Sequence, residues 1–445
     1  MTTVAEKAPD DPADDVALLE HSATEVAVAR AKRKGRRRGR RPVRRAMVLI
    51  HRWPSLVLGL LLVLETTSGA VLLYHGEYFR ATHSNLYEKS AAATAGVDIG
   101  PDRAIAEVAS TAPEFAPTWA ARDAGIWMVG NVDYQTVYAV DPGTGAVNGH
   151  VFTDGGVMGF LVNLHDCALT CEGYPGHVGW LGDSVPTLGM SFLTDITWAS
   201  VILGVLGLLM ILLAVTGIVT WWPGLKKWKH GFRVRTGKGR FARDYDLHNV
   251  FGIVALPFIL MWGITGAAFE FPVVEKAWLA VTGGEQVEEP DLSVTPNPAA
   301  AGRPDIGTDR AVSTALAAVP GTAQWIGVPT EDADWYEIDI VTGYAASAER
   351  AIYGGDAYVL IDAHDASNIV VFEDGSGPLA NRFYDKYLEP THFGWNVNAW
   401  WRIIWFVLGM APLVLMVTGV STWLFRRGTK KRQRAARADR VAPVA

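Results

Sequence analysis

Four long apolar stretches stand out in the pattern of hydrophobic and polar positions along the chain. Each has about the twenty residues that a helix needs to cross the hydrocarbon core of a bilayer. The first is too long for the apolar region of a signal peptide and lacks a small-residue cleavage site, so we expect it to be retained. We predict transmembrane helices at residues 47–75, 197–222, 248–271 and 400–425.

Two long polar blocks, residues 76–196 and 272–399, separate these stretches. Each block begins with a helical pattern and continues with the alternation of apolar and polar positions that is typical of strands. In the first block, the sequence Asp-Pro-Gly-Thr-Gly at residues 141–145 predicts a turn between two strands. We therefore expect each block to form a small α+β domain.

The two halves of the chain repeat one another. His51 lies 18 residues before Gly69, and His248 lies 18 residues before Gly266. The sequence Val-Thr-Gly-x-x-Thr-Trp occurs in both the second and the fourth apolar stretch. Parallel repeats of this kind place the functional centre between the halves. The predicted fold is an integral membrane all-α bundle of four transmembrane helices in two parallel repeats, with two extracytoplasmic α+β domains.

Composition and charge favour a membrane protein over a soluble one. Charged residues make up 19% of the chain, less than the about 25% of ordinary soluble domains. Of the 40 Lys and Arg residues, 27 fall in three short tracts beside the apolar stretches, whereas the polar blocks are acidic. Cytoplasmic loops carry the excess of Lys and Arg, so we expect a membrane protein with both termini in the cytoplasm. The remaining segments are a disordered acidic and then basic tail at 1–46, a basic loop at 223–247 and a basic tail at 426–445.

Sequence motifs exclude some functions. The chain has no Walker A motif and no Rossmann glycine motif, so it has no recognisable nucleotide or flavin domain of its own. The basic tract before the first apolar stretch is better explained as a cytoplasmic flank than as a nucleic-acid-binding arm. We expect the lipid bilayer as a partner, and no nucleic acid.

Four of the 11 histidines occupy matching places in the repeat. His51 and His248 stand at the cytoplasmic starts of the first and third predicted helices, and His165 and His392 stand in the outer segments that lead into the second and fourth. Two neutral imidazoles at one depth on facing helices are what a bis-histidine haem iron requires. We predict that His51 pairs with His248 and His165 with His392, each pair as axial ligands of a haem b. A single histidine at a membrane edge would need no such role.

Helical rise places the two histidine layers on the order of 25 Å apart. An aromatic side chain such as Trp262 is a candidate to stand between them. A metal transporter would also use histidines, but it would be expected to add Asp or Glu at mid-depth.

Further polar residues lie near the predicted haems. Arg52 and Arg402 are candidates to pair with haem propionates, although Arg52 also fits the excess of cytoplasmic positive charge. Glu65 is an acid well inside a predicted span, with a proton or charge role or a structural hydrogen bond as alternatives. His75 is the alternative axial ligand. Four glycines follow Ser or Thr inside the apolar stretches and favour either helix packing or the close approach of a flat macrocycle; they are Gly69, Gly217, Gly266 and Gly419.

Cys167 and Cys171 lie just after His165, on the side of the membrane that we expect to be oxidising. We predict a disulfide that braces this loop, with a redox-active thiol pair as the alternative.

Several motifs taken in order resemble the PepSY-associated transmembrane proteins, the iron-regulated membrane reductases of bacteria. The resemblance covers about residues 45–426, and the first outer block resembles a PepSY domain. The second block departs from that pattern because no Asp-Pro-Gly-Thr-Gly follows Asp362. The residues that carry the resemblance are His51-Arg52-Trp53, Ser68-Gly69-Ala70, Asp102-Arg103-Ala104, the turn at 141–145, Val215-Thr216-Gly217, Trp221-Trp222-Pro223, Asp246-Leu247-His248-Asn249, Gly252 and Thr265-Gly266.

The resemblance implies an inner-membrane haem protein with His51, His165, His248 and His392 as ligands. Its substrate would be a ferric siderophore or another ferric chelate outside the cytoplasm. Its electrons would come from an external donor such as a quinone, a reductase or a small reductant. Two alternatives stay open: a haem-free PepSY-type sensor or binding protein, and a haem membrane subunit for a separate flavoprotein reductase.

Overall fold

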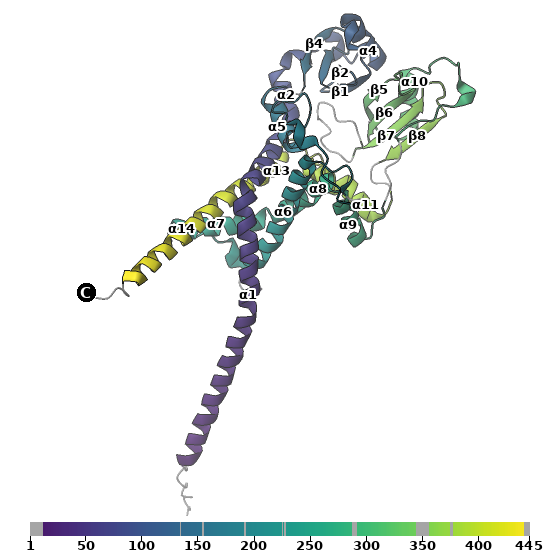
Figure 1. Cartoon of the computed structure of the whole chain (residues 1–445). Coiled ribbons are helices and arrows are strands. Elements are labelled where there is room, and N and C mark those ends of the chain that lie inside the picture. The colour runs from purple at the N-terminus through teal and green to yellow at the C-terminus, as the bar shows by residue number, and fades with distance from the viewer. Residues whose placement is uncertain are drawn as a thin grey trace, which may run out of the picture.

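The computed structural model consists of a helical base and a β-sheet lobe that stands on one end of it (Figure 1). The structure describes residues 42–436 except for positions 134, 154, 191–192, 225, 227, 230, 287–291, 344–355 and 374–376. Most of the segment predicted as a disordered tail, residues 1–46, lies outside the described residues. The helices of the base are α1 (Pro12–Leu72), α6 (Trp198–Trp221), α7 (Arg240–Val254), α8 (Leu256–Glu270), α13 (Arg402–Gly409) and α14 (Ala411–Asp439).

The predicted bundle of four transmembrane helices is wrong. Within the described residues, three helical segments are long and apolar enough to cross a membrane, namely Pro42–Leu72, Trp198–Trp221 and Arg402–Ala436. The third apolar stretch instead forms α7 and α8, which meet at a bend of 59°. Pro257, at the start of α8, explains the bend, because its ring has no N–H to donate and clashes with the carbonyl of the preceding turn.

The two predicted outer domains are also wrong, because their strands form a single antiparallel sheet of eight strands in the order β4-β3-β2-β1-β5-β6-β7-β8. The two blocks join where β1 pairs with β5, with Ala120 opposite Ile326. An unpaired edge strand exposes backbone N–H and C=O groups. Pairing of β1 with β5 gives these groups hydrogen-bond partners on one edge strand of each block. The strands are β1 (Trp119–Asp123), β2 (Ile126–Gly130), β3 (Thr136–Val140), β4 (Val147–Phe152), β5 (Thr322–Gly327), β6 (Trp335–Val341), β7 (Ala357–Asp362) and β8 (Ile369–Glu373).

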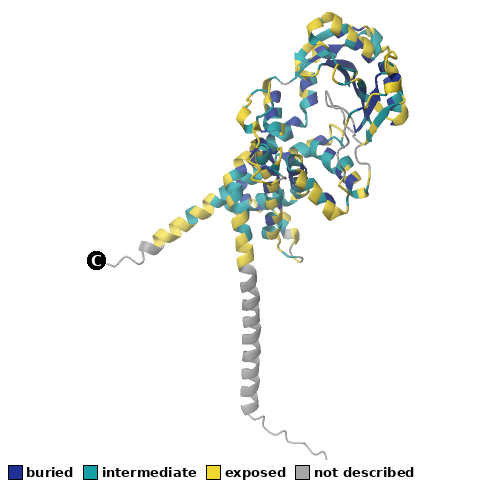
Figure 2. Ribbon diagram, turned by 45° about the vertical axis from the view of Figure 1, so that its right-hand side comes forward, coloured by how far each residue is buried: buried dark blue, intermediate teal, exposed yellow. Residues whose placement is uncertain are grey.

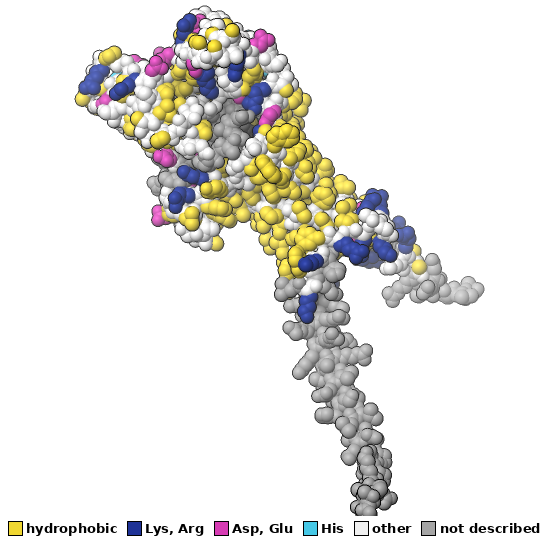
Figure 3. All heavy atoms as spheres, turned by 180° about the vertical axis from the view of Figure 1, so that it is seen from behind, with side chains coloured by type: hydrophobic (Ala, Val, Ile, Leu, Met, Phe, Trp, Pro, Cys, Tyr) yellow, Lys and Arg dark blue, Asp and Glu magenta, His cyan; other side chains and the backbone are white. Residues whose placement is uncertain are grey.

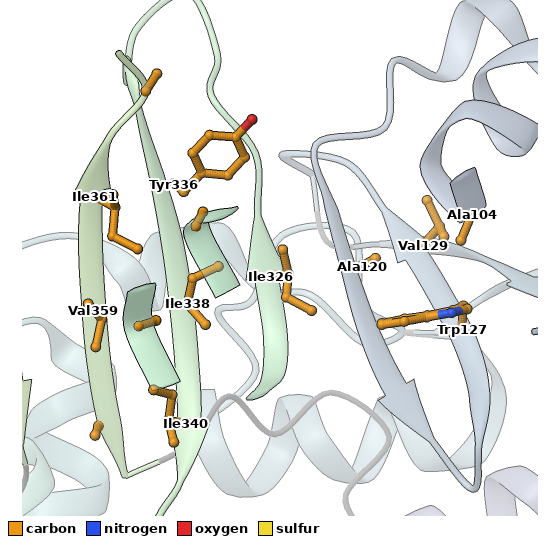
Figure 4. Close-up of a cluster of buried hydrophobic side chains, with 14 of the residues drawn as sticks. Ala104, Ala120, Trp127, Val129, Ile326, Tyr336, Ile338, Ile340, Val359 and Ile361 are labelled. Atoms are coloured by element: carbon orange, nitrogen blue, oxygen red, sulfur yellow. The ribbon is translucent and has the colours of Figure 1, made fainter. Parts of the chain in front are cut away.

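One face of this sheet carries a core that both blocks share. Helices α4 (Gly100–Thr111) and α10 (Thr308–Ala318) bury Ala104 and Ala315 against it. Figure 4 shows strand side chains from both blocks in this core. Figure 2 shows that buried residues concentrate in the sheet, whereas the outer sides of the base helices are more exposed. The lobe therefore folds as one unit.

The second block repeats the first even where their turn sequences differ. The Asp141 carboxylate accepts a hydrogen bond from the Ser90 backbone N–H, and the Asp362 carboxylate accepts one from the Asn297 backbone N–H, both at 2.8 Å. Burial raises the pKa of Asp141, but its hydrogen bonds from Ser90 and Thr144 outweigh burial and lower the pKa to about 2. Asp362 thus accepts the same kind of backbone hydrogen bond as Asp141, although no Pro-Gly-Thr-Gly follows it.

Short helices connect the base to the sheet lobe. Two of them, α5 and α12, return the chain to the top of the base before the next long helix begins. These connecting helices are α2 (His75–Thr82), α3 (Ala91–Thr94), α5 (Gly156–Cys167), α9 (Pro272–Thr282), α11 (Leu379–Phe383) and α12 (Glu389–Phe393).

The surface of the base is divided into zones. Figure 3 shows a wide apolar surface on this face of the helices and a cluster of Lys and Arg at the end farthest from the sheet lobe. On α1, Val57 is 73% exposed and Leu60 is 59% exposed, as expected for side chains that face lipid. We name the two ends of the base the basic side and the sheet side.

The joined sheet predicts a cross-link between the halves. Ala120→Cys with Ile326→Cys should form a disulfide, because residues directly opposite in an antiparallel pair are about 5 Å apart and within disulfide range. Mass spectrometry of digested protein, with and without reductant, would detect the linked peptides. The matched control is Val129→Cys with Ile326→Cys. Val129 lies opposite Ala120 on the other side of β1 and so about 10 Å from Ile326. Equal cross-linking of both variants would contradict the joined sheet.

Candidate functional site

The four repeated histidines meet in two pairs. The ring centres of His51 on α1 and His248 on α7 are 6.2 Å apart, and those of His165 on α5 and His392 on α12 are 6.3 Å apart. A metal–imidazole nitrogen bond is about 2 Å long, so two imidazoles on opposite sides of one metal have ring centres about 6 Å apart. Each pair takes one histidine from each half of the chain, which places both pairs between the halves.

A hydroxyl from the same half holds the Nδ1 atom of each imidazole. For the basic-side pair, the Thr216 Oγ1 atom lies 3.0 Å from His51 Nδ1, and the Thr418 Oγ1 atom lies 3.1 Å from His248 Nδ1. For the sheet-side pair, Ser68 Oγ lies 3.4 Å from His165 Nδ1 and Thr265 Oγ1 lies 2.6 Å from His392 Nδ1. A hydroxyl therefore lies beside Nδ1 of all four imidazoles, although Glu65 lies closer to Nδ1 of His165.

The hydroxyl groups fix which ring nitrogen carries the proton. Each hydroxyl donates its own hydrogen to the carbonyl four residues earlier in its helix, at 2.7 to 2.9 Å. Its oxygen therefore accepts, and Nδ1–H donates. Among the described residues, no Nε2 of the four has a hydrogen-bond partner. Nδ1 held by an acceptor and Nε2 left with its lone pair is the arrangement of a metal-binding histidine.

A glycine follows each of these hydroxyl residues and lies against the same imidazole. A Cβ added at Gly217, Gly266 or Gly419 would lie 3.4 to 3.7 Å from the nearest imidazole carbon, and one at Gly69 would overlap the His165 ring. The sequence showed these glycines, but we did not foresee the role of the preceding hydroxyls. The sequence could have indicated this role, because Ser-Gly or Thr-Gly occurs at all four equivalent places.

Each histidine pair lines its own cavity. The basic-side cavity has a volume of about 1330 Å³ and contains His51 and His248. The sheet-side cavity has a volume of about 320 Å³ and contains His165 and His392. Leu62 and Met210 line both cavities, so these two side chains form a shared wall. Trp262, expected between the two layers, lines only the sheet-side cavity, and its Nε1 donates to the His392 carbonyl at 3.1 Å.

Glu65 lies in the sheet-side cavity beside His165. Its carboxylate accepts from His165 Nδ1 at 2.9 Å, and its backbone carbonyl lies 2.8 Å from the same atom. Burial lowers the pKa of His165, but the hydrogen bonds to Glu65 and the charges of Glu65 and Asp166 together outweigh burial and raise the pKa to about 9. Burial and the charge of His165 lower the pKa of His392.

The two predicted arginines lie in different settings. Arg52 lines the basic-side cavity, and its buried Nε has no hydrogen-bond partner among the described residues. Arg402 lines the sheet-side cavity, but it donates to the Leu73 carbonyl at 2.6 Å and pairs with the Glu77 carboxylate. Arg402 therefore clamps α13 to the end of α1, and the buried Nε of both arginines has no hydrogen-bond partner among the described residues.

The remaining candidates lie outside the two cavities. His75 begins α2, stacks on Phe79 with ring centres 6.4 Å apart, and is not among the residues that line either cavity. Cys167 and Cys171 form a disulfide that closes the turn after His165. Within the part of the chain that the structure describes, no group of three or more His, Cys, Asp or Glu could hold a metal ion.

The glycine contacts predict that Gly→Ala substitutions in the two halves change the free energy of unfolding unequally. Gly69→Ala should lower the free energy of unfolding by about 1–3 kcal/mol, because its methyl group overlaps the His165 ring. The matched control is Gly266→Ala, whose methyl group would lie 3.7 Å from the His392 ring and should cost little. Thermal unfolding of the detergent-solubilised variants, followed by tryptophan fluorescence, measures both. An equal decrease in the free energy of unfolding in the two variants would show that helix packing, and not the imidazole, explains these glycines.

Comparison with known proteins supports the resemblance found in the sequence. An uncharacterized protein of Pseudomonas aeruginosa is 24% identical over 264 residues, which is 54% of this chain and 63% of that relative. The alignment thus spans less than two thirds of the relative's length. The family model described as "PepSY-associated TM region" matches residues 48–426, most of the chain. The chain therefore belongs to the family of PepSY-associated transmembrane proteins.

Proposed function

We propose that this chain is a haem-containing oxidoreductase of the bacterial inner membrane that passes electrons to ferric complexes outside the cytoplasm. The observation that carries the proposal is the two imidazole pairs, with ring centres 6.2 and 6.3 Å apart and every Nδ1 held by a hydroxyl. Each pair offers two nitrogens to one metal. A haem iron needs two such axial ligands, because its macrocycle supplies the others.

The surroundings of both pairs fit a haem. Cofactor sites are mostly apolar and have volumes of about 300 to 1,000 Å³; the sheet-side cavity is near the low end and the basic-side cavity exceeds the range. The glycine beside each imidazole lets the ring lie against the helix backbone. Arg52, with its unsatisfied buried Nε, would hold a propionate at the basic-side pair.

The chain's residues would supply binding, orientation and insulation. Bound haem supplies one-electron chemistry. The four imidazoles would bind it, the hydroxyls would fix their orientation, and the apolar walls would exclude water. The sequence spacing between His51 and Gly69, which contacts His165, corresponds to about 27 Å along α1. The cavities extend toward each other from these depths and meet at Leu62 and Met210, so the barrier between two bound groups would be much thinner than that distance.

We infer the orientation of the chain in the membrane from the distribution of its charged residues. Basic residues at the end farthest from the sheet favour that end as cytoplasmic, with the sheet lobe outside. An external donor, whether quinone, reductase or small reductant, would deliver electrons at the basic side. A ferric siderophore or another ferric chelate would accept them at the sheet side. Ferrous iron is held less tightly by hard-oxygen chelators, so reduction would release the metal.

The first test is the absorption spectrum of purified protein with a pyridine haemochrome count. Wild type should contain two haem b groups per chain. His51→Ala and His165→Ala should each contain one, and His75→Ala, the matched control outside both cavities, should retain two. A colourless wild-type protein from cells supplied with haem would refute the proposal and favour the haem-free sensor. The sensor alternative also predicts that the protein tolerates His51→Ala.

A rapid-mixing experiment separates the reductase from a haem subunit that serves another protein. Chemically reduced protein mixed with a ferric hydroxamate chelate should be reoxidised within the mixing experiment, with ferrous iron trapped by a colorimetric chelator. Two haems without ferric reduction would favour the subunit of a flavoprotein reductase.

The hydroxyl supports predict a specific weakening of ligand binding. Thr216→Val removes the acceptor of His51 Nδ1–H but preserves shape, so it should weaken haem retention about 10- to 100-fold. The matched control is Thr220→Val, whose hydroxyl bonds the Gly217 carbonyl and not an imidazole. Haem transfer to apomyoglobin measures retention. Equal retention by both variants would contradict the role of Thr216.

A further inference from the structure

We propose that the sheet-side centre has the lower reduction potential of the two, and that Glu65 is the positioning residue that lowers it. The inference rests on the proposed function and adds to it an energetic order of the two centres. Its basis is an unequal distribution of charge in an otherwise repeated site.

The Nδ1 acceptors differ at one position. Among the described residues, His165 is the imidazole of the four whose Nδ1 contacts a carboxylate, that of Glu65 at 2.9 Å. The other three meet neutral acceptors: Thr216 for His51, Thr418 and the Leu415 carbonyl for His248, and Thr265 for His392. A carboxylate on Nδ1–H makes the imidazole a more basic metal ligand and so stabilises the oxidised metal.

The repeat shows that this carboxylate is a departure from the shared pattern. The spacing of 197 residues that relates His51 to His248 and Gly69 to Gly266 also relates Glu65 to Trp262. Each of these two residues stands three positions before the hydroxyl that supports an imidazole. In the second and fourth apolar stretches that place is taken by Leu213 and Leu415. Three of the four equivalent positions are therefore uncharged, and Glu65 is the exception.

The wider surroundings of the two centres have opposite sign. The described residues that line the basic-side cavity include no Asp or Glu but six cations, Arg44, Arg45, Arg52, Arg426, Arg427 and Lys430. The sheet-side cavity is lined by one cation, Arg402, which is paired with Glu77, and by four acids, Glu65, Glu77, Asp166 and Glu270.

Charge of this kind shifts redox equilibria in a known direction. A metal centre carries one more positive charge when oxidised than when reduced. Nearby anions favour the oxidised state and nearby cations favour the reduced state, most strongly where water is excluded. Both the local contact at His165 and the cavity charges therefore lower the potential at the sheet side relative to the basic side.

This order suits a reductase whose acceptor is hard to reduce. The sheet-side centre would give one electron to the ferric iron of a chelate, becoming oxidised as that iron becomes ferrous. The external donor would replace the electron through the basic side. Movement toward the lower-potential centre is uphill, but a membrane potential negative inside favours the outward transfer of negative charge.

The test is a potentiometric titration of the purified holoprotein, followed by its absorption spectrum at one fixed pH. Wild type should titrate with two midpoint potentials. Glu65→Gln should raise the lower one and leave the higher one unchanged. We expect the ratio of reduced to oxidised sheet-side centre at a given potential to rise about tenfold, which corresponds to about 59 mV for a one-electron couple. His51→Ala, which removes a basic-side ligand, should retain the lower-potential component.

The matched control is Glu77→Gln, which removes a carboxylate from the same cavity but not from an imidazole, and should raise the lower potential less. Glu65→Asp keeps the charge on a shorter side chain and should give an intermediate shift, which guards against misfolding of Glu65→Gln. Two haems with potentials that do not respond to Glu65→Gln, or a His51→Ala protein that keeps the higher component, would overturn this inference alone. A colourless wild type would overturn the proposed function, and this inference with it.

Discussion

The hydrogen bond from each Nδ1–H to a helix hydroxyl is the interaction on which the rest of the site depends. A histidine near apolar helices is stable only if its polar atoms have partners. Because Thr216 and its three counterparts already donate to backbone carbonyls, they can only accept, and this sets the tautomer. The glycine after each hydroxyl then lets the ring lie against the helix. Two small residues thus determine both the orientation and the chemistry of each imidazole.

The same logic explains why neither half can build the site alone. Each half supports its own two imidazoles, yet a pair forms only when an imidazole from the other half faces it, as His51 faces His248. The sheet lobe enforces this arrangement from outside. Pairing of β1 with β5 and a common hydrophobic core tie the two outer blocks together. Association of the halves in the lobe therefore also positions the helices below it.

The parts that local periodicity determines were predictable from the sequence. The 18-residue spacing of His51 from Gly69, repeated in the second half, was enough to suggest which histidines share a depth. The joining of the two blocks was not, since β1 and β5 are about 200 residues apart and no local pattern distinguishes an edge strand that pairs from one that does not. The third apolar stretch was predicted to span the membrane from its length, and the structure shows a bend where Pro257 begins α8. The contact of Glu65 with His165 was equally hidden, because it depends on how α5 folds back onto α1.

The two halves repeat the same supports for the imidazoles, but the charges around the two histidine pairs differ. The two ends of the base are therefore not equivalent. Two equal centres would exchange electrons without preference, and the basic and acidic linings of the cavities break that equality. Basic residues at the membrane surface also favour one topology, so the charge that orients the chain in the bilayer would also raise the reduction potential of a metal centre bound beside it. The carboxylates of the sheet side have no such topological role. Burying Glu65 beside an imidazole costs desolvation energy, which its pairing with His165 offsets. A group that is costly to bury and absent from the three equivalent positions is explained better by the chemistry of the centre than by the stability of the fold.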